Sequence, residues 1–263
     1  MSALLELAGL SRRFSGLLAV DAVDMAVARG SIHAVIGPNG AGKTTLFNLV
    51  SGVIAPTAGR IALAGAEITA LPAERRAGLG IARTFQNIRL FGAMTVLENA
   101  LCGMQPRERV GLAGTMLRSP GFRAQEAASE AAARAALEFV GLADRAEVAA
   151  SALSYGDQRR LEIARAMASG PALLLLDEPA AGMNPAETAA LAVLVRALRD
   201  RGATILLVEH DMHFVMGLSD HVTVLNFGRR IFDGAPAAAR HDPVVIEAYL
   251  GAKVAARLAG SAA

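Results

Sequence analysis

The chain has 263 residues, of which 53% are hydrophobic, and a formal net charge of +2 with a pI near 9.1. This length and composition provide a core large enough for one domain, or for one domain with an inserted subdomain. The nearly balanced charge and the aromatic content of 4% without tryptophan argue against a basic field or a base-stacking surface, so we expect no nucleic-acid partner.

Membrane-crossing and secretory segments are not expected either. Mean hydropathy is +0.40, but no apolar run approaches the ~20 residues that a membrane-spanning helix needs. The first residues lack a basic stretch followed by a long apolar one, so we expect no signal peptide and a cytoplasmic protein. The single cysteine, Cys102, fits a reducing compartment and is expected to be a small core residue.

The first 90 residues combine strand patterns with a glycine-rich loop. Residues 31–36 form an apolar strand rich in β-branched residues, and residues 44–50 open a helix with apolar residues at helical spacing. A loop between such a strand and such a helix is the setting in which glycines bind phosphate. Further short strands are predicted at residues 4–7, 22–28 and 61–63.

That loop matches the phosphate-binding pattern G-x-x-x-x-G-K-[ST] at every fixed position, which indicates ATP or GTP as the ligand. Its glycines let backbone N–H groups turn inward, where they and the helix N-terminus cradle a β-phosphate. Lys43 is expected to contact the β- and γ-phosphates, and the Thr44 hydroxyl to bind Mg²⁺. The alternative, a turn that only enters a helix, is disfavoured by the complete pattern. The expected nucleotide-binding residues are Gly37, Pro38, Asn39, Gly40, Ala41, Gly42, Lys43, Thr44 and Thr45.

Beyond residue 94 the pattern becomes helical and later returns to alternating strands and helices. Residues 94–167 are rich in alanine, and their clearest predicted helix covers 124–142. After Pro171 the alternation is typical of a parallel sheet covered by helices. The predicted strands are 173–176, 204–208 and 222–225, and the predicted helices are 185–199 and 212–218.

Two carboxylates follow the most apolar of these strands. Residues 173–176 are all leucine, and Asp177 and Glu178 come directly after them. Because parallel sheets place ligand sites at the carboxyl ends of their strands, both side chains are expected beside the phosphate loop. Asp177 can then hold Mg²⁺, usually through water, and Glu178 can orient or deprotonate the water that attacks a γ-phosphate.

Another motif precedes this strand, since residues 153–166 read LSYGDQRRLEIARA. With it, the chain resembles the ABC-transporter ATPase family over essentially its whole length. Ser154 and Gly156 begin a predicted helix whose positive end can approach a phosphate. The elements that carry the resemblance follow the family order: Phe14, residues 37–45, Gln86, residues 153–158, Asp177 with Glu178, residues 181–184, and His210.

The resemblance implies an α/β fold with a RecA-like P-loop ATPase core. This core has a mostly parallel sheet with helices and N-terminal antiparallel strands, and it carries an inserted helical subdomain. No internal repeat is evident, so residues 1–263 are expected to form a single ABC ATPase domain. The expected parts are the ATP-binding core at 1–90 and 163–250, the helical subdomain with the signature motif at 91–162, and a C-terminal tail at 251–263.

The resemblance also assigns roles to residues that are uninformative alone. Phe14 would stack on the adenine, Gln86 would contact Mg²⁺ or the attacking water, and His210 would contact the γ-phosphate. In the family, the phosphate approached by Ser154 and Gly156 belongs to ATP on the opposite subunit. The structural alternatives are a core aromatic for Phe14, a surface amide for Gln86, a strand-end histidine for His210, and a helix cap for Ser154 with Asp157.

Three positions depart from the common family pattern. The usual signature Leu-Ser-Gly-Gly-Gln has Tyr155 and Asp157 at its third and fifth positions here, while the serine and the second glycine remain. The loop after Glu178 usually ends in Asp, whereas Asn184 takes that place. The phosphate contact is therefore expected to persist, but a role that depends on the charge of the Asp is not.

Several segments are similar to the ATPases of branched-chain amino-acid importers: residues 83–91, 94–99, 180–185, 208–212 and 248–251, together with Tyr155. This similarity implies import of branched-chain or related amino acids, powered by ATP with Mg²⁺. The implied partners are transmembrane permease subunits, a second ABC ATPase subunit in a homodimer or heterodimer, and a periplasmic or extracellular substrate-binding protein. The chain would then be peripheral on the inner face of the membrane. Alternatives are urea or amide import, lipopolysaccharide export and a soluble ABC ATPase; Glu178 and His210 argue against a catalytically silent adaptor.

The segment between Gln86 and Glu98 is expected to face a permease. No single helical or strand period places all of its apolar residues on one buried face, so we expect some of them to be exposed. An exposed apolar patch there can receive the cytoplasmic coupling helix of a permease subunit. The alternative is a loop that packs these residues inward. They are Ile88, Leu90, Phe91, Met94, Val96 and Leu97.

Overall fold

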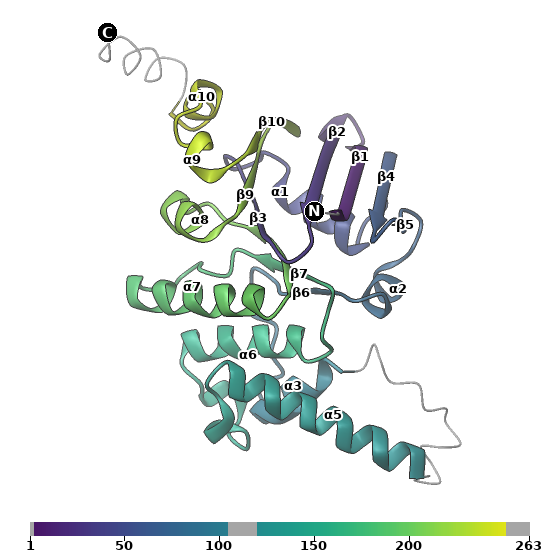
Figure 1. Ribbon diagram of the computed structural model, residues 1–263, viewed down its shortest axis with the longest axis vertical. Helices are drawn as coiled ribbons and strands as arrows, with labels where there is room; N and C mark the ends of the chain where they lie inside the picture. Colours follow the sequence, from purple (N-terminus) through teal and green to yellow (C-terminus); the bar gives the residue numbers. More distant parts are fainter. Residues whose placement is uncertain (1–2, 105–119, 251–263) are drawn as a thin grey trace.

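The computed structural model describes residues 3–104 and 120–250, and it has two sheets and a lobe of helices (Figure 1). The four-stranded sheet is antiparallel, with strand order β2-β1-β4-β5. It consists of β1 (Ala3–Phe14), β2 (Leu17–Ala28), β4 (Ala58–Leu63) and β5 (Ala66–Glu67). Since the expected N-terminal strands are antiparallel, this sheet confirms that part of the fold.

The six-stranded sheet has the order β10-β9-β3-β8-β7-β6, and its five strands from β9 to β6 are parallel. Strands β3, β7 and β8 are buried at every position, because layers cover both faces of the sheet. Its strands are β3 (Ile32–Ile36), β6 (Ile81–Arg83), β7 (Leu173–Asp177), β8 (Thr204–Val208), β9 (His221–Asn226) and β10 (Arg229–Gly234). The predicted parallel core is confirmed.

The helices divide between the faces of this sheet and the lobe below it (Figure 1). Those of the core are α1 (Lys43–Ser51), α2 (Ala73–Gly78), α7 (Pro185–Asp200), α8 (Met212–Leu218), α9 (Pro236–Ala239) and α10 (Pro243–Leu250). Those of the lobe are α3 (Val96–Cys102), α5 (Pro120–Phe139) and α6 (Tyr155–Met167). Over the ranges 3–104 and 120–250, no helix combines the length and apolarity needed to cross a bilayer.

Three hydrophobic clusters hold these layers together. One lies between the two sheets and includes α1, and a second packs the other face of the parallel sheet against α7 and α8. The third belongs to the lobe and runs from Val96 to Ala168. Helix α6 contributes to two clusters, because Leu161 and Ala164 pack in the lobe while Ile163 packs under the sheet. The expected boundary between 162 and 163 therefore falls inside a continuous helix, and the division into subdomains stays a proposal.

Several element predictions were wrong in extent. The predicted strand 4–7 is part of the 12-residue β1, whose register shifts around Leu7 and Leu10 interrupt the alternation that marks a strand. The edge strand β10 was missed because none of its residues is buried, so it carries no apolar pattern. Cys102 is half-buried at the end of α3 and is not the core residue expected.

Candidate functional site

The phosphate loop joins the end of β3 to the start of α1. Backbone carbonyls of neighbouring strands approach two of its glycines so closely that no side chain would fit there. A Cβ atom on Gly37 would lie 2.2 Å from the carbonyl oxygen of Leu225, and one on Gly42 would lie 2.4 Å from that of Ala19. Both glycines also have positive φ, 152° and 103°. The loop is thus held between β9 and β2 in a shape that only glycine at these positions permits.

Lys43 lies over this loop. Its side chain is buried, and Nζ donates to Gly37 O at 2.6 Å and to Pro38 O at 3.0 Å. Burial lowers the pKa of Lys43, and the nearby carboxylate of Glu178 opposes that shift. Thr44 is exposed at the first turn of α1, so its hydroxyl is accessible to a ligand of the loop.

Asp177 ends β7 beside this loop and is held by an arginine that sequence reasoning missed. Arg83 Nη2 lies 2.8 Å from Asp177 Oδ2, and both side chains are at most 10% exposed. The other end of the Arg83 fork donates to Asn48 and Ser51 of α1. Arg83 ends β6, the parallel neighbour of β7. The sequence does not reveal that these two strands are neighbours, so it gave no signal for this contact.

The three residues that were expected to be catalytic lie together, with Gln86 and His210 close to the Glu178 carboxylate. Gln86 Nε2 donates to Glu178 Oε2 at 3.0 Å, and His210 Nδ1 lies 3.6 Å from the same oxygen. Glu178 has a φ of 46°, a conformation that costs about 1–3 kcal/mol for a non-glycine residue and that concentrates at functional sites. Its N–H donates to Val208 O, which ties the strained residue to β8. The meeting of these three residues favours the functional roles over the structural alternatives for Gln86 and His210.

Glu209 is a further residue of the site that sequence reasoning missed, and it places another carboxylate near Glu178. It is 1% exposed, and it accepts the N–H of Ala180 at 2.8 Å and that of His210 at 3.2 Å. Burial raises the pKa of Glu209, while those N–H groups and the His210 ring oppose the rise. It therefore fixes the backbone on both sides of the Glu178 site. Its place directly after β8 matches that of Asp177 and Glu178 at the end of β7, which is the signal that could have revealed it.

The signature motif begins α6, where Ser154 is the N-cap and accepts the Asp157 N–H at 3.2 Å. The Asp157 carboxylate does not complete a capping box; it pairs with Arg145 and Arg160 instead. Gly156 is packed so closely that an added Cβ would lie 3.0 Å from Glu187 Oε1. Within residues 3–104 and 120–250, no hydrogen bond of Ser154 reaches the phosphate loop. The contact of Ser154 and Gly156 with phosphate across a dimer stays a prediction.

Two other predicted positions have clear structural settings. Asn184 is the N-cap of α7 and forms a capping box with Glu187, so the amide supplies a side-chain acceptor for the helix cap. Phe14 ends β1 with 41% exposure, and the Arg12 guanidinium lies 4.6 Å from its ring centre. The alternative of a core aromatic is therefore wrong, and the adenine contact stays a prediction.

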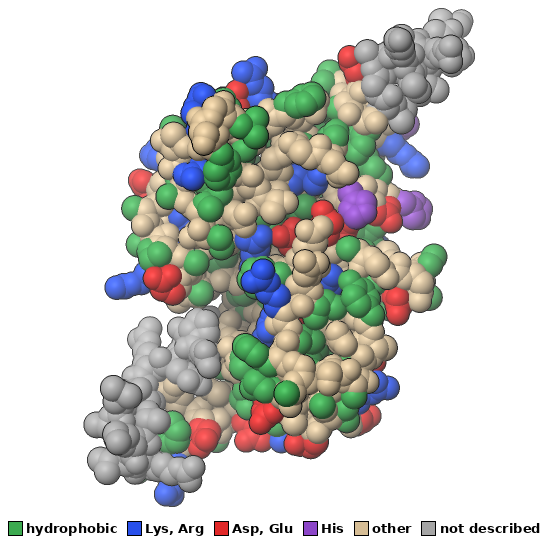
Figure 2. Space-filling model, turned by 180° about the vertical axis from the view of Figure 1, so that it is seen from behind, with side chains coloured by type: hydrophobic (Ala, Val, Ile, Leu, Met, Phe, Trp, Pro, Cys, Tyr) green, Lys and Arg blue, Asp and Glu red, His purple; other side chains and the backbone are tan. Residues whose placement is uncertain are grey.

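The apolar segment before α3 is partly exposed, as expected. Phe91 is 54% exposed, whereas Val96 and Leu97 are buried in the lobe and are unavailable to a partner. Ile88, Leu90 and Met94 are half-buried. A groove of about 520 Å³ runs between α2, β6 and the ends of α3 and α6, and Phe91 and Cys102 line it. From the side opposite to Figure 1, the molecule is notched between its upper and lower parts (Figure 2).

Comparisons with known proteins agree with this geometry. A family model described as "ABC transporter" matches residues 20–181, and one described as "Branched-chain amino acid ATP-binding cassette transporter" matches residues 229–255. The high-affinity branched-chain amino acid transport ATP-binding protein LivG of Escherichia coli is 49% identical over 251 residues, covering 94% of this chain and 98% of that protein. BraF of Pseudomonas aeruginosa, which carries the same description, is 47% identical over 249 residues, with the same coverage of both chains.

Solved structures lead to the same family. The ADP conformation of MJ1267, an ATP-binding cassette of an ABC transporter, superposes with a TM-score of 0.83 at 30% identity and covers 95% of this chain and 100% of that one. A nucleotide-free ATP-binding cassette from an ABC transporter also gives 0.83 at 30% identity, covering 94% and 99%. The chain therefore belongs to the ATP-binding proteins of ABC transporters, in the branched-chain amino acid group that LivG and BraF represent.

Proposed function

We propose that this chain hydrolyses ATP to power the import of branched-chain or related amino acids. The observation that carries the proposal is the meeting of Gln86, Glu178 and His210 at the carboxyl ends of β7 and β8, next to the strand that leads into the phosphate loop. The curated relatives LivG and BraF are described as transport ATP-binding proteins for such amino acids, which supports the choice of substrate.

Each side chain of the site has a part in hydrolysis. Lys43 neutralises the β- and γ-phosphates, and the loop N–H groups hold them. Glu178 accepts a proton from the attacking water, which Gln86 and His210 help to place. Thr44 and Asp177 offer the oxygen ligands that Mg²⁺ prefers, and Arg83 holds Asp177 in place. Bound Mg²⁺ would neutralise charge on the phosphate oxygens.

The proposed partners are permease subunits and a second ATPase subunit. The groove of about 520 Å³ beside the exposed Phe91 would receive an amphipathic helix from a permease. Ser154 and Gly156 at the N-terminus of α6 would meet the ATP of the second subunit, which is either a copy of this chain or a related ATPase. A periplasmic or extracellular binding protein would supply the amino acid. In such an assembly this chain lies on the cytoplasmic face of the membrane.

The variant Glu178→Gln tests the function. Its amide can still hydrogen-bond water but cannot accept a proton, so ATP binding should persist while hydrolysis stops. With Mg²⁺ and its partner ATPase, the variant should elute as an ATP-dependent dimer in size-exclusion chromatography. Co-purification of permease subunits with the unsubstituted chain would support the transporter over a soluble ABC ATPase. Hydrolysis at the unsubstituted rate by Glu178→Gln would refute the assigned chemistry.

A further inference from the structure

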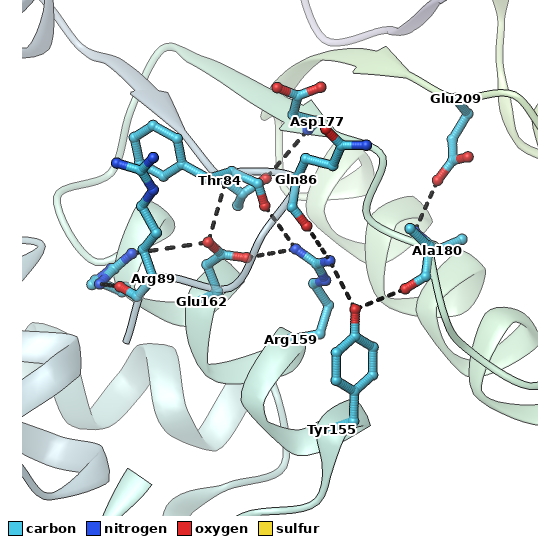
Figure 3. A network of polar contacts seen from close by, with 12 residues as sticks. Thr84, Gln86, Arg89, Tyr155, Arg159, Glu162, Asp177, Ala180 and Glu209 are labelled. Carbon is cyan, nitrogen blue, oxygen red and sulfur yellow. Dashed lines mark hydrogen bonds and ion pairs between the residues drawn. The ribbon is translucent and has the colours of Figure 1, made fainter. Parts of the chain in front are cut away.

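Two charged side chains of α6 hold the backbone of the segment that carries Gln86 (Figure 3). Arg159 donates from Nη1 to Phe85 O at 2.8 Å and from Nη2 to Gln86 O at 2.9 Å. Glu162 Oε1 accepts the Phe85 N–H at 3.2 Å, while Oε2 accepts from Arg159 at 2.8 Å. Three backbone groups of the Gln86 segment therefore find their partners on one turn of α6.

The depth of this ion pair indicates a role in positioning. Both side chains are 0% exposed, and the cost of removing two charges from water offsets much of their attraction. Burial raises the pKa of Glu162, and Arg159 opposes the rise. What the pair supplies is geometry, because a planar guanidinium that reaches two carbonyls and a carboxylate fixes all three relative to one another.

Tyr155 extends these contacts to the loop that follows Glu178. Its hydroxyl donates to Ala181 O at 2.9 Å and accepts from Arg159 Nη2 at 3.3 Å. The Ala181 N–H donates to Glu178 O, and the Glu178 carboxylate accepts from the Gln86 side chain. The result is a closed circuit of contacts that runs through Gln86, Glu178, Ala181, Tyr155 and Arg159.

We propose that Tyr155 and Arg159 are positioning residues for the catalytic pair of Gln86 and Glu178, an inference that rests on the proposed function. Arg159 fixes the backbone of Gln86, and Tyr155 fixes the loop that follows Glu178. Because one helix carries both, the separation of the Gln86 amide from the Glu178 carboxylate depends on the position of α6. The glycine that the family usually has in place of Tyr155 offers no hydroxyl, so the link to Ala181 comes from this side chain.

Two conservative substitutions test the proposal in the full chain. Arg159→Lys keeps the charge opposite Glu162 but loses the fork that reaches two carbonyls, and we expect kcat for ATP hydrolysis to fall about tenfold. Tyr155→Phe removes only a hydroxyl, and we expect a fall of about threefold, in line with one lost hydrogen bond. The KM for ATP should stay within about twofold of its original value, because neither side chain contacts the phosphate loop.

A matched control is the next residue on the same helix. The Arg160 guanidinium pairs with Asp157 and is 42% exposed, so Arg160→Lys should leave kcat unchanged. Hydrogen exchange provides a second readout: amides of residues 84–89 should exchange faster in Arg159→Lys, while the Tm, measured alongside, separates this effect from global unfolding. A merely structural role would lower the Tm and the active fraction together without changing kcat per folded molecule.

The outcomes separate the inference from the function on which it rests. If Arg159→Lys and Tyr155→Phe both hydrolyse ATP as fast as Arg160→Lys, the positioning role is overturned and the proposed function stands. If Arg159→Lys fails to fold, Tyr155→Phe decides alone, since it removes one hydroxyl from a side chain that is 44% exposed. If the unsubstituted chain with its partners does not hydrolyse ATP, the proposed function fails, and the inference fails with it.

Discussion

Gln86 Nε2 and Glu178 Oε2 lie 3.0 Å apart, although 92 positions separate the two residues in the chain. Each follows the end of a strand, and those strands, β6 and β7, are parallel neighbours. The amide therefore occupies one of the acceptor positions on the carboxylate, and an attacking water would use another of them beside the Gln86 side chain. Removing the amide with Gln86→Ala should lower kcat, and equal rates in the variant and the unsubstituted chain would contradict its role.

Lys43→Ala should abolish productive ATP use. The substitution removes the ammonium that lies over the loop carbonyls, so the β- and γ-phosphates lose their main protein counterion in a confined site. Steady-state ATPase assays and binding of a fluorescent ATP analogue measure the effect. The chain contains one other lysine, so Lys253→Ala is a control with the same change in charge. Activity near that of the control would refute the assignment of the loop.

Phe91→Glu should weaken assembly with permease subunits. A carboxylate at position 91 would have to lose its water once a permease helix docks, and it would replace an apolar contact, so docking should be disfavoured even though Arg89 and Arg165 also line the groove. ATP affinity of the free subunit should not change, because Phe91 is 54% exposed there. Val193→Glu is the control, since Val193 is 63% exposed on α7, away from the groove. Co-purification and transport in proteoliposomes distinguish the two variants, and equal assembly would remove the groove as the docking site.

The buried His33 should lower the free energy of unfolding of the protein as the pH becomes acidic. Burial and the neighbouring His221 lower its pKa from 6.5 to about 4, although Asp233 opposes the shift. Between these values the unfolded chain binds a proton at His33 that the folded chain does not, so the free energy of unfolding falls as the pH falls from about 6.5 to 4, by up to about 3 kcal/mol. Arg230 Nη1 lies 3.6 Å from Asp233 Oδ2 and adds a positive charge beside His33, His221 and Asp233.

His33→Gln isolates this contribution. Glutamine can keep the hydrogen bond to Thr223 but does not titrate. Urea unfolding at pH 7 and pH 4.5 should show a smaller loss of stability for His33→Gln than for the unsubstituted chain. His213→Gln, at an exposed position on α8, should behave like the unsubstituted chain. The same pH slope in all three proteins would contradict the assignment to His33.

Asn184→Ala should destabilise the protein by about 1 kcal/mol, the usual cost of losing an N-cap. The Asn184 side chain accepts the Glu187 N–H at 3.0 Å, and the Asn184 N–H donates in return to the Glu187 carboxylate at 3.0 Å. Asn184→Asp restores the residue that the family usually has and keeps an acceptor at the cap, so it should retain full stability. Chemical denaturation measures both variants. If the alanine and aspartate variants were equally stable, the cap would contribute nothing.

The parallel core and most of the site were predictable because local patterns encode them. The phosphate loop is contiguous, and the leucines of β7 lead directly into Asp177 and Glu178. Arg83, Glu209 and Arg159 were missed for the opposite reason: each acts on a residue that is distant in sequence. Their partners become visible only when strand order and helix packing are known. In the sequence, Arg159 is one of several charged residues of a helix. Only the folded structure shows that it donates a hydrogen bond to Phe85 O.

Because α6 is one uninterrupted helix with side chains in two hydrophobic clusters, it limits how the molecule can move. A sharp bend in α6 would break its backbone hydrogen bonds, so any rotation of the lobe against the core would take place at the segments on either side of this helix. If α6 turns with the lobe, Ile163 has to slide against the underside of the sheet, and the Gln86 segment travels with Arg159. A partner that binds at the groove near Phe91 and displaces the lobe would then shift the Gln86 segment relative to Glu178 as a rigid unit, without any local unfolding.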